Sequence, residues 1–142
     1  MFERYAIFYT PTGALADFGA QWLGWDSAQG SAVVQPEMTG IDLPTITQTP
    51  HKYGLHGTLK APFKLAEGCD SAQLQDVAAT FATGQPEIEI GALALRHDSG
   101  FVALRPRCQQ IALLNFAAAT VKAFDGFRAA LTDVDIARRR EA

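Results

Sequence analysis

The stretch GLHGTLKAPF, residues 54–63, places side chains that can do chemistry at every second position. Successive residues of a β-strand point to opposite faces, so an extended chain here separates its side chains by type. One face carries two leucines and a glycine, which suit packing against a core. The other face carries a histidine, a threonine and a lysine: His56, Thr58 and Lys60.

These three residue types together suit a phosphate ester. The imidazole of His56 can take or give a proton near neutral pH, and the hydroxyl of Thr58 can donate to a non-bridging phosphate oxygen. Lys60 adds positive charge without a fixed geometry. The arrangement requires no metal ion. The alternative is a solvated histidine or one bonded only to its neighbours, because a single His-x-Thr in a strand is a common pattern.

Aromatic and basic residues elsewhere are weaker candidates for substrate binding. Tyr5 and Tyr9 share a face of the first expected strand, where they either stack on a base or sugar or pack in the core. Arg105, in the segment FVALRP, shares a face with Phe101 and Ala103. Its guanidinium either clamps a phosphate through two hydrogen bonds or lies in solvent at a strand end.

The composition is that of a globular protein with a substantial core, with 48% hydrophobic and 19% charged residues among 142. We expect a single domain over residues 1–142. A net charge of −3 gives no general attraction for long nucleic acids. No apolar run approaches the ~20 residues that cross a bilayer, and the first residues lack a signal-peptide pattern. Cys69 and Cys108 stand alone, as in a reducing compartment, so we predict a cytoplasmic protein without a membrane partner.

The apolar pattern predicts strands over 4–11 and 51–65 and a hairpin over 86–107 that turns at 98–100. Helices are expected over 12–25, within 41–50, over 70–84 and over 108–132, with a basic helical stub over 133–142. Asp42 caps the second helix, and Asp70 or Ser71 caps the third. The buried side of the longest helix is expected at Ile111, Leu114, Ala118, Val121 and Phe124. The hairpin favours an α+β fold, with an antiparallel or mixed sheet and helices on one side.

Four segments in order resemble one uncharacterised branch of the 2H phosphoesterase superfamily, a branch associated with phosphonate metabolism. They are RYAIFYTP, WLGWD, YGLHGTLKAPF and AFDGFRAALTDVDIARRR, at residues 4–11, 22–26, 53–63 and 123–140. Members of the superfamily carry two His-x-Thr/Ser motifs, one from each of two lobes that are antiparallel sheets backed by helices. The resemblance implies hydrolysis of a small cyclic phosphodiester, or related 2′,5′-linkage chemistry, without metal or cofactor.

Carried over to this chain, the resemblance makes His56 the general acid or base and Thr58 the holder of the phosphate. The substrate would be a small phosphodiester or nucleotide-like molecule, with Lys60, Arg105, Tyr5 and Tyr9 as auxiliary binding residues.

The second motif of the superfamily is missing from these residues. His97 with Ser99 matches its letters, but the pair lies at the expected hairpin turn and lacks the apolar frame, and His51 has no Ser or Thr two places on. We therefore expect one lobe and part of the second, truncated at the C-terminus relative to the family. Because a positioned acid or base contributes about 10²–10⁴-fold, the isolated chain is expected to be inactive.

An incomplete lobe exposes apolar surface, which predicts a homodimer. The alternative to an enzyme is a non-catalytic phosphate- or nucleotide-binding module, or an inactive fragment.

Overall fold

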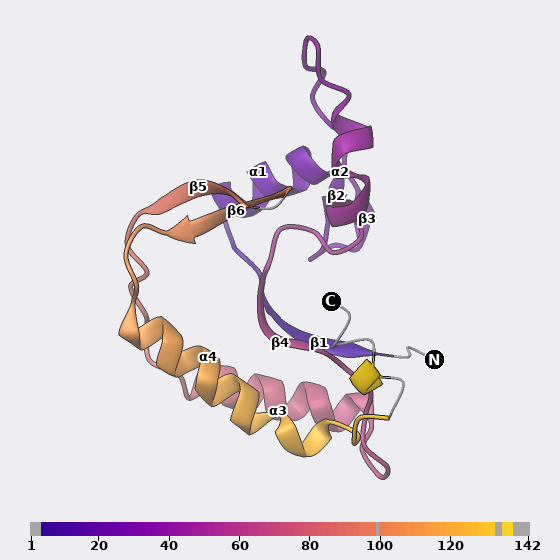
Figure 1. Ribbon diagram of the computed structural model, residues 1–142, viewed down its shortest axis with the longest axis vertical. Coiled ribbons are helices and arrows are strands. Elements are labelled where there is room, and N and C mark those ends of the chain that lie inside the picture. The colour runs from indigo at the N-terminus through magenta and orange to yellow at the C-terminus, as the bar shows by residue number, and fades with distance from the viewer. Residues whose placement is uncertain (1–3, 99, 133–134, 138–142) are drawn as a thin grey trace. The chain divides into compact units, whose positions relative to one another are not determined.

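The computed structural model describes residues 4–98, 100–132 and 135–137 (Figure 1). Contacts between residues group the chain into two units. One unit runs from Ile7 to Leu59, and the other joins the residues up to Ala6 with those from Lys60 onward. Each unit is described by itself below. A single domain over residues 1–142 stays a prediction.

The strands form small pairs. β1 (Tyr5–Tyr9) pairs with β4 (Gly57–Phe63), β2 (Trp25–Asp26) with β3 (Ser31–Ala32), and β5 (Leu93–Asp98) with β6 (Phe101–Pro106). Together with the helices they confirm the α+β class. The described strands do not merge into one larger sheet, since each pair stands as its own two-stranded sheet.

In the unit from Ile7 to Leu59, two helices support the strands: α1 (Ala14–Leu23) and α2 (Leu43–His51). The cap at Asp42 is confirmed, because its side chain accepts a hydrogen bond from the backbone of Thr45. Phe18 of α1 is 54% exposed, whereas Gly19 and Leu23 are buried. The buried face of α1 therefore centres on Gly19, where Leu55 packs closely against the helix backbone.

The strand expected over 51–65 begins later than predicted. α2 continues to His51, and the amides of Tyr53 and Gly54 then bond to the carbonyls of Pro50 and His51. These bonds close a turn, so the extended segment starts only at Gly57. The left-handed φ of Gly54 also interrupts an extended backbone at this point.

In the other unit, α3 (Ser71–Thr83) begins at Asp70 with a reciprocal capping box to Gln73, as the sequence predicts. α4 (Ile111–Ala123) leads into a short 3₁₀ turn, η1 (Asp125–Phe127). Phe81 of α3 contacts Phe116 and Phe124, with ring centroids 6.1 and 5.4 Å apart. α3 and α4 lie side by side along this aromatic contact (Figure 1).

The predicted buried side of α4 is mostly wrong. Phe124 is fully buried as expected, but Ile111, Leu114 and Val121 are 67%, 48% and 44% exposed. The side turned inward instead carries Phe116 and the fully buried Thr120. α4 has apolar residues all round, so its periodicity offers two stripes, and the contact with Phe81 selects one of them.

Backbone hydrogen bonds join two distant segments of this unit, a feature we call the clasp, residues 64–66 with 127–129. The amide of Ala66 donates to the carbonyl of Phe127 at 2.8 Å, and the amide of Ala129 donates to the carbonyl of Lys64 at 2.9 Å. Leu65 and Arg128 form an antiparallel bridge between them. The clasp therefore returns the chain after η1 to the end of β4.

The hairpin is confirmed with a later start. β5 begins at Leu93, so the alternating residues 87–90 are not a strand, and Glu87 and Glu89 among them are exposed. The left-handed Gly91 separates them from β5. Ser99 of the turn, and with it the His97–Ser99 pair, lies outside the described residues, as do residues 138–142 of the expected stub.

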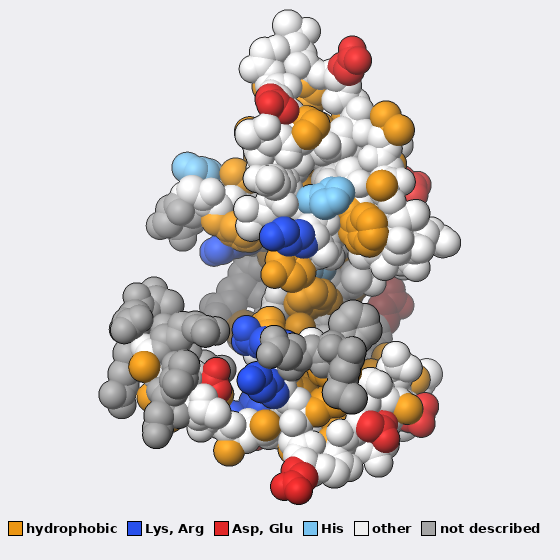
Figure 2. All heavy atoms as spheres, turned by 90° about the vertical axis from the view of Figure 1, so that its right-hand side faces the viewer, with side chains coloured by type: hydrophobic (Ala, Val, Ile, Leu, Met, Phe, Trp, Pro, Cys, Tyr) orange, Lys and Arg blue, Asp and Glu red, His pale blue; other side chains and the backbone are white. Residues whose placement is uncertain are grey.

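Large apolar side chains remain at the surface, including Leu95 and Val102 at 70% and 58% exposed. Figure 2 shows hydrophobic side chains between polar and charged ones on one face. The homodimer through an exposed lobe surface stays a prediction. Across the described residues, no helix has the length and apolar character needed to span a membrane.

Candidate functional site

His56 lies directly before β4 and is held on two sides. Its ring stacks on Phe8 of β1, with centroids 3.9 Å apart and planes inclined by 29°. Its Nδ1 atom lies 2.9 Å from the carbonyl oxygen of Gly54. Tyr53 tilts toward the ring at 6.0 Å. The side chain is half-buried, and no described residue hydrogen-bonds its Nε2 atom.

The turn before His56 depends on a glycine. Gly54 has a φ of +69°, a left-handed conformation that L-residues with a side chain adopt at a cost. A Cβ at this position would also lie 2.8 Å from the Cβ of Ser27. Any other residue here therefore strains the turn that carries the carbonyl facing His56.

Leu55 seats this turn on helix α1. A Cβ added to Gly19 would lie 2.5 Å from the Cβ of Leu55, so the leucine packs directly on the helix backbone. This contact agrees with the expected packing role of the motif's leucines, one of which lies on each side of the His-x-Thr pair. The backbone just before His56 is thus supported by Gly19 through Leu55 and by Ser27 through Gly54.

Thr58 lies in β4 with its side chain exposed, and no described residue bonds its hydroxyl. Tyr9 packs over the intervening Gly57, where a Cβ would lie 3.9 Å from its ring. Because strand residues alternate, Tyr9 is on the face opposite His56 and Thr58. The structure therefore brings Phe8, rather than Tyr9, to the histidine.

Lys60 is the next residue of the alternation, but the structure buries it. Its side chain is 5% exposed, and Nζ donates to the carbonyl of Val121 at 3.0 Å and to Asp125 at 3.3 Å. The ammonium also lies 5.5 Å from the centre of the Phe63 ring. This ammonium is thus engaged within its own unit, at the C-terminal turn of α4, instead of lying on an open anion-binding face.

Asp125 completes the contact around Lys60. Its carboxylate also accepts a hydrogen bond from Nε of Arg128 at 3.0 Å. These two cations hold the pKa of Asp125 below its ordinary value, with the Arg128 hydrogen bond as the largest cause and the Lys60 hydrogen bond next. The charge of Lys60 is therefore matched by a carboxylate that stays ionised.

The remaining predicted residues belong to the unit that contains Lys60. Tyr5 is half-buried in β1. Arg105 is exposed in β6 opposite Ala94, and the register places Arg96 diagonally from it on the same face. The substrate-binding roles of Tyr5, Tyr9, Lys60 and Arg105 stay predictions.

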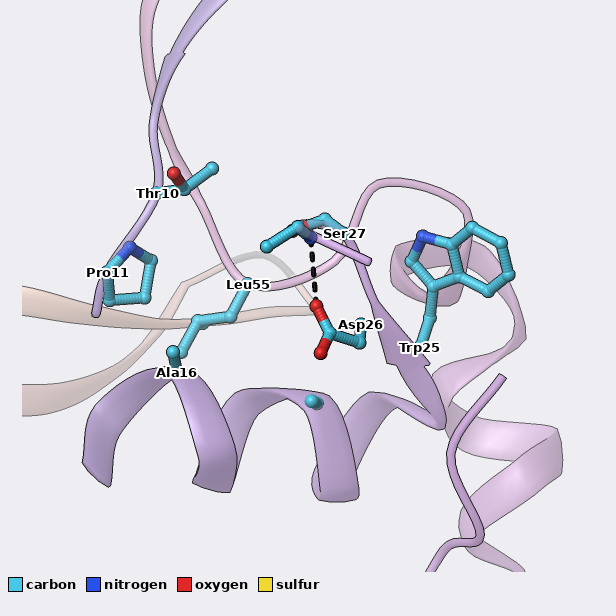
Figure 3. A pocket seen from close by; sticks show the side chains of 9 residues that line it. Thr10, Pro11, Ala16, Trp25, Asp26, Ser27 and Leu55 are labelled. Carbon is cyan, nitrogen blue, oxygen red and sulfur yellow. Dashed lines mark hydrogen bonds between the residues drawn. The ribbon is translucent and has the colours of Figure 1, made fainter. Parts of the chain in front are cut away.

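A small cavity of about 40 Å³ opens in the unit that contains His56 (Figure 3). Leu55, Ala16, Trp25 and Thr10 line it. The carboxylate of Asp26 is turned back on its own loop, where it accepts from the amides of Ala28 and Gln29 at 2.8 and 3.1 Å. A cavity of this volume admits only a few water molecules.

The other two described histidines have different surroundings. Nδ1 of His51 donates to the carbonyl of Leu23 at 2.7 Å, at the C-terminal end of α1, and its ring tilts against Trp25. His97 is exposed in β5 opposite Val102. Among the described residues, no group of three or more His, Cys, Asp or Glu side chains is placed to hold a metal ion.

Two residues that shape the site, Phe8 and Gly54, were not predicted from the sequence. Phe8 alternates with Tyr9 in β1, so the pairing of β1 with β4 would have placed one of them on the histidine face, but the register was not readable from the sequence. Gly54 carried a readable signal, because a glycine just before a functional residue often marks a left-handed backbone.

Known proteins match this chain in sequence. A family described as a protein of unknown function, DUF1045, matches residues 58–142, so the matched region begins at Thr58. A protein of Janthinobacterium sp. (strain Marseille) named ribose 1,5-bisphosphate phosphokinase PhnN is 35% identical over 144 residues, which cover 98% of this chain and 32% of the relative.

A protein of the same name from Laribacter hongkongensis (strain HLHK9) is 33% identical over 133 residues, covering 89% of this chain and 31% of the relative. The chain thus spans about a third of the length of these curated relatives. No solved structure matches it.

Proposed function

The chain belongs to the family of proteins of unknown function DUF1045, and on this basis we propose that it supplies one proton-transfer group and one phosphate ligand to a metal-independent phosphodiesterase. His56 transfers the proton, and Thr58 holds a non-bridging phosphate oxygen. The second proton carrier belongs to a part of the protein outside these 142 residues. The link to phosphonate metabolism is part of the same proposal and rests on the sequence resemblance.

One observation carries the proposal: His56 and Thr58 each keep a working atom available. Nε2 of His56 has no bond to a described residue although the ring is fixed by Phe8 and Gly54. Thr58 is two residues away on the same face, and its exposed hydroxyl has no partner among the described residues. A fixed ring with a free nitrogen meets the geometric requirement for general acid–base catalysis.

The names of the relatives suggest a phosphodiester. A kinase for ribose 1,5-bisphosphate requires ribose that carries phosphate esters on C1 and C5. A cyclic phosphate that joins O1 and O2 of ribose 5-phosphate yields this compound when water opens the ring. The water oxygen forms the new bond to phosphorus, its proton passes to a base, the bond from phosphorus to O2 breaks, and O2 takes a proton from an acid.

The kinase activity in the relatives' name fits the part of those proteins that this chain does not cover. The 142 residues contain neither Gly-x₄-Gly-Lys-Ser/Thr nor Gly-x-Gly-x-x-Gly, two glycine-rich loops with which kinases hold the phosphates of ATP. Thr58 and His56 offer one hydroxyl and one imidazole, without the backbone cradle that a triphosphate needs. We therefore assign phosphodiester opening, rather than phosphoryl transfer from ATP, to this chain.

The test uses the protein in its full encoded length, with the 1,2-cyclic phosphate of ribose 5-phosphate as substrate and a chelator present. We expect consumption of the cyclic phosphate and formation of ribose 1,5-bisphosphate, measured by ³¹P NMR, and a much lower rate for His56→Gln. Binding of the cyclic phosphate without turnover would instead favour the non-catalytic binding module. Equal rates for both proteins would remove His56 from the reaction.

A further inference from the structure

We infer that Gly54 and Phe8 are positioning residues that fix the tautomer of His56, with the proton on Nδ1 and the lone pair on Nε2. The starting observation is the 2.9 Å contact between Nδ1 and the carbonyl oxygen of Gly54. A carbonyl oxygen accepts hydrogen bonds and has no proton to donate. The bond therefore forms only when Nδ1 carries a hydrogen, and a neutral ring then leaves its lone pair on Nε2.

Gly54 can present this carbonyl because it is a glycine. Its φ of +69° turns the peptide so that the oxygen faces the ring two residues later. The nearby Ser27, 2.8 Å from where a Cβ would be, leaves no room for a side chain. Position 54 therefore requires glycine for two reasons, the left-handed backbone and the lack of room for a side chain. Both requirements arise from the turn that presents the Gly54 carbonyl to His56.

Phe8 fixes the plane of the ring. The two rings stack at 3.9 Å, so tilting the imidazole out of this plane would break the stack, while the hydrogen bond from Nδ1 to the Gly54 carbonyl determines which edge of the ring faces the turn. Such stacked pairs contribute a preference of roughly two- to tenfold. Together the two contacts hold one tautomer and aim one nitrogen, which a histidine in free solution does not do.

The catalytic part of this inference rests on the proposed function, and the tautomer does not. The first experiment is therefore two-bond ¹H–¹⁵N NMR of the imidazoles in the wild-type protein, at a pH at which His56 is neutral. The His56→Gln variant assigns the signals of His56. We expect Nδ1 of His56 to appear as the protonated nitrogen and Nε2 as the bare one. The opposite assignment, or an even mixture, would overturn the inference even if the protein hydrolyses its substrate.

Two pairs of variants separate positioning from folding. Phe8→Leu should lower the Nδ1–H fraction and reduce kcat roughly two- to tenfold with little change in KM, and Phe8→Tyr should restore both. Gly54→Ala should disturb the same NMR signals. Gly68→Ala is its matched control, because Gly68 has a φ of +81° and open space around it, so it carries the backbone strain without facing a histidine.

Wild-type signals and rates in both Phe8→Leu and Gly54→Ala would refute positioning by these residues. If no cyclic phosphate is hydrolysed by any of these proteins, the proposed function fails, while the NMR result still decides the tautomer.

Discussion

The alternating side chains of His56, Thr58 and Lys60 run into strand β4 (Gly57–Phe63), and the two ends of this pattern are used in opposite ways. At the first end, His56 and Thr58 keep a nitrogen and a hydroxyl free of described partners. At the other end, Lys60 is 5% exposed, with its ammonium bonded to Val121 and Asp125. An alternating polar residue therefore indicates a polar environment. The residues packed around it determine whether its polar atom stays available for a ligand or is hydrogen-bonded within the protein.

The largest expected effect tests the open end. His56→Gln keeps a polar side chain but removes the imidazole, so kcat for the cyclic phosphate should fall by about 10²–10⁴-fold, with only a modest fall in melting temperature from the lost stack on Phe8. The matched control is His97→Gln, since His97 is exposed in β5. A comparable loss of kcat in His97→Gln would mean that the effect is not specific to His56.

The buried end should respond in stability instead. Lys60→Met removes the ammonium from the Val121 carbonyl and should lower the free energy of unfolding by about 1–3 kcal/mol, measured by urea denaturation. The KM for the cyclic phosphate should stay within about twofold of wild type, as expected when no substrate contact is lost. Lys64→Met, at an exposed lysine four residues on, is the control. A raised KM with unchanged stability would instead support the predicted role of Lys60 in substrate binding.

Sequence reasoning recovered what short-range rules determine. The caps at Asp42 and Asp70 and the hairpin follow from local hydrogen bonding and turn chemistry. Local rules did not predict which side of α4 is buried or that Lys60 is buried. Each outcome depends on which distant element packs against the residue. Phe81 selects the stripe, and Asp125 receives the lysine 65 positions away in the chain.

A smaller effect concerns how the open end is supported. Gly19→Ala places a Cβ 2.5 Å from Leu55, and such overpacking costs about 1–3 kcal/mol. The same change gains up to about 1 kcal/mol from helix propensity, so the net loss of stability should be modest, as read by thermal unfolding. Gln21→Ala, exposed on the same helix, should change stability by less than about 0.5 kcal/mol. A stabilised Gly19→Ala would contradict the close packing of Leu55 on α1.

The smallest effect is a pH dependence at the buried end. Hydrogen bonds from Arg128 and then Lys60 lower the pKa of Asp125 from its ordinary 3.8. Its contribution to stability is thus fully present above pH 3.8 and is lost as the pH falls through the lowered value. Asp125→Asn lacks this dependence, so its stability difference from wild type should shrink as the pH falls below 3.8. Parallel unfolding curves would mean that neither Arg128 nor Lys60 contacts Asp125 in solution.

The clasp between residues 64–66 and 127–129 has a practical consequence for engineering. Because its backbone bonds join the two ends of the segment that holds α3 and α4, a cut inside that segment leaves two pieces still tied by non-covalent contacts. The exposed tip at Glu67 and Gly68 is a natural place for such a cut or for an inserted reporter domain. Reassembly of two co-expressed pieces divided there would show that the clasp, together with the contacts of Lys60 to Val121 and Asp125, holds the pieces together without a covalent link.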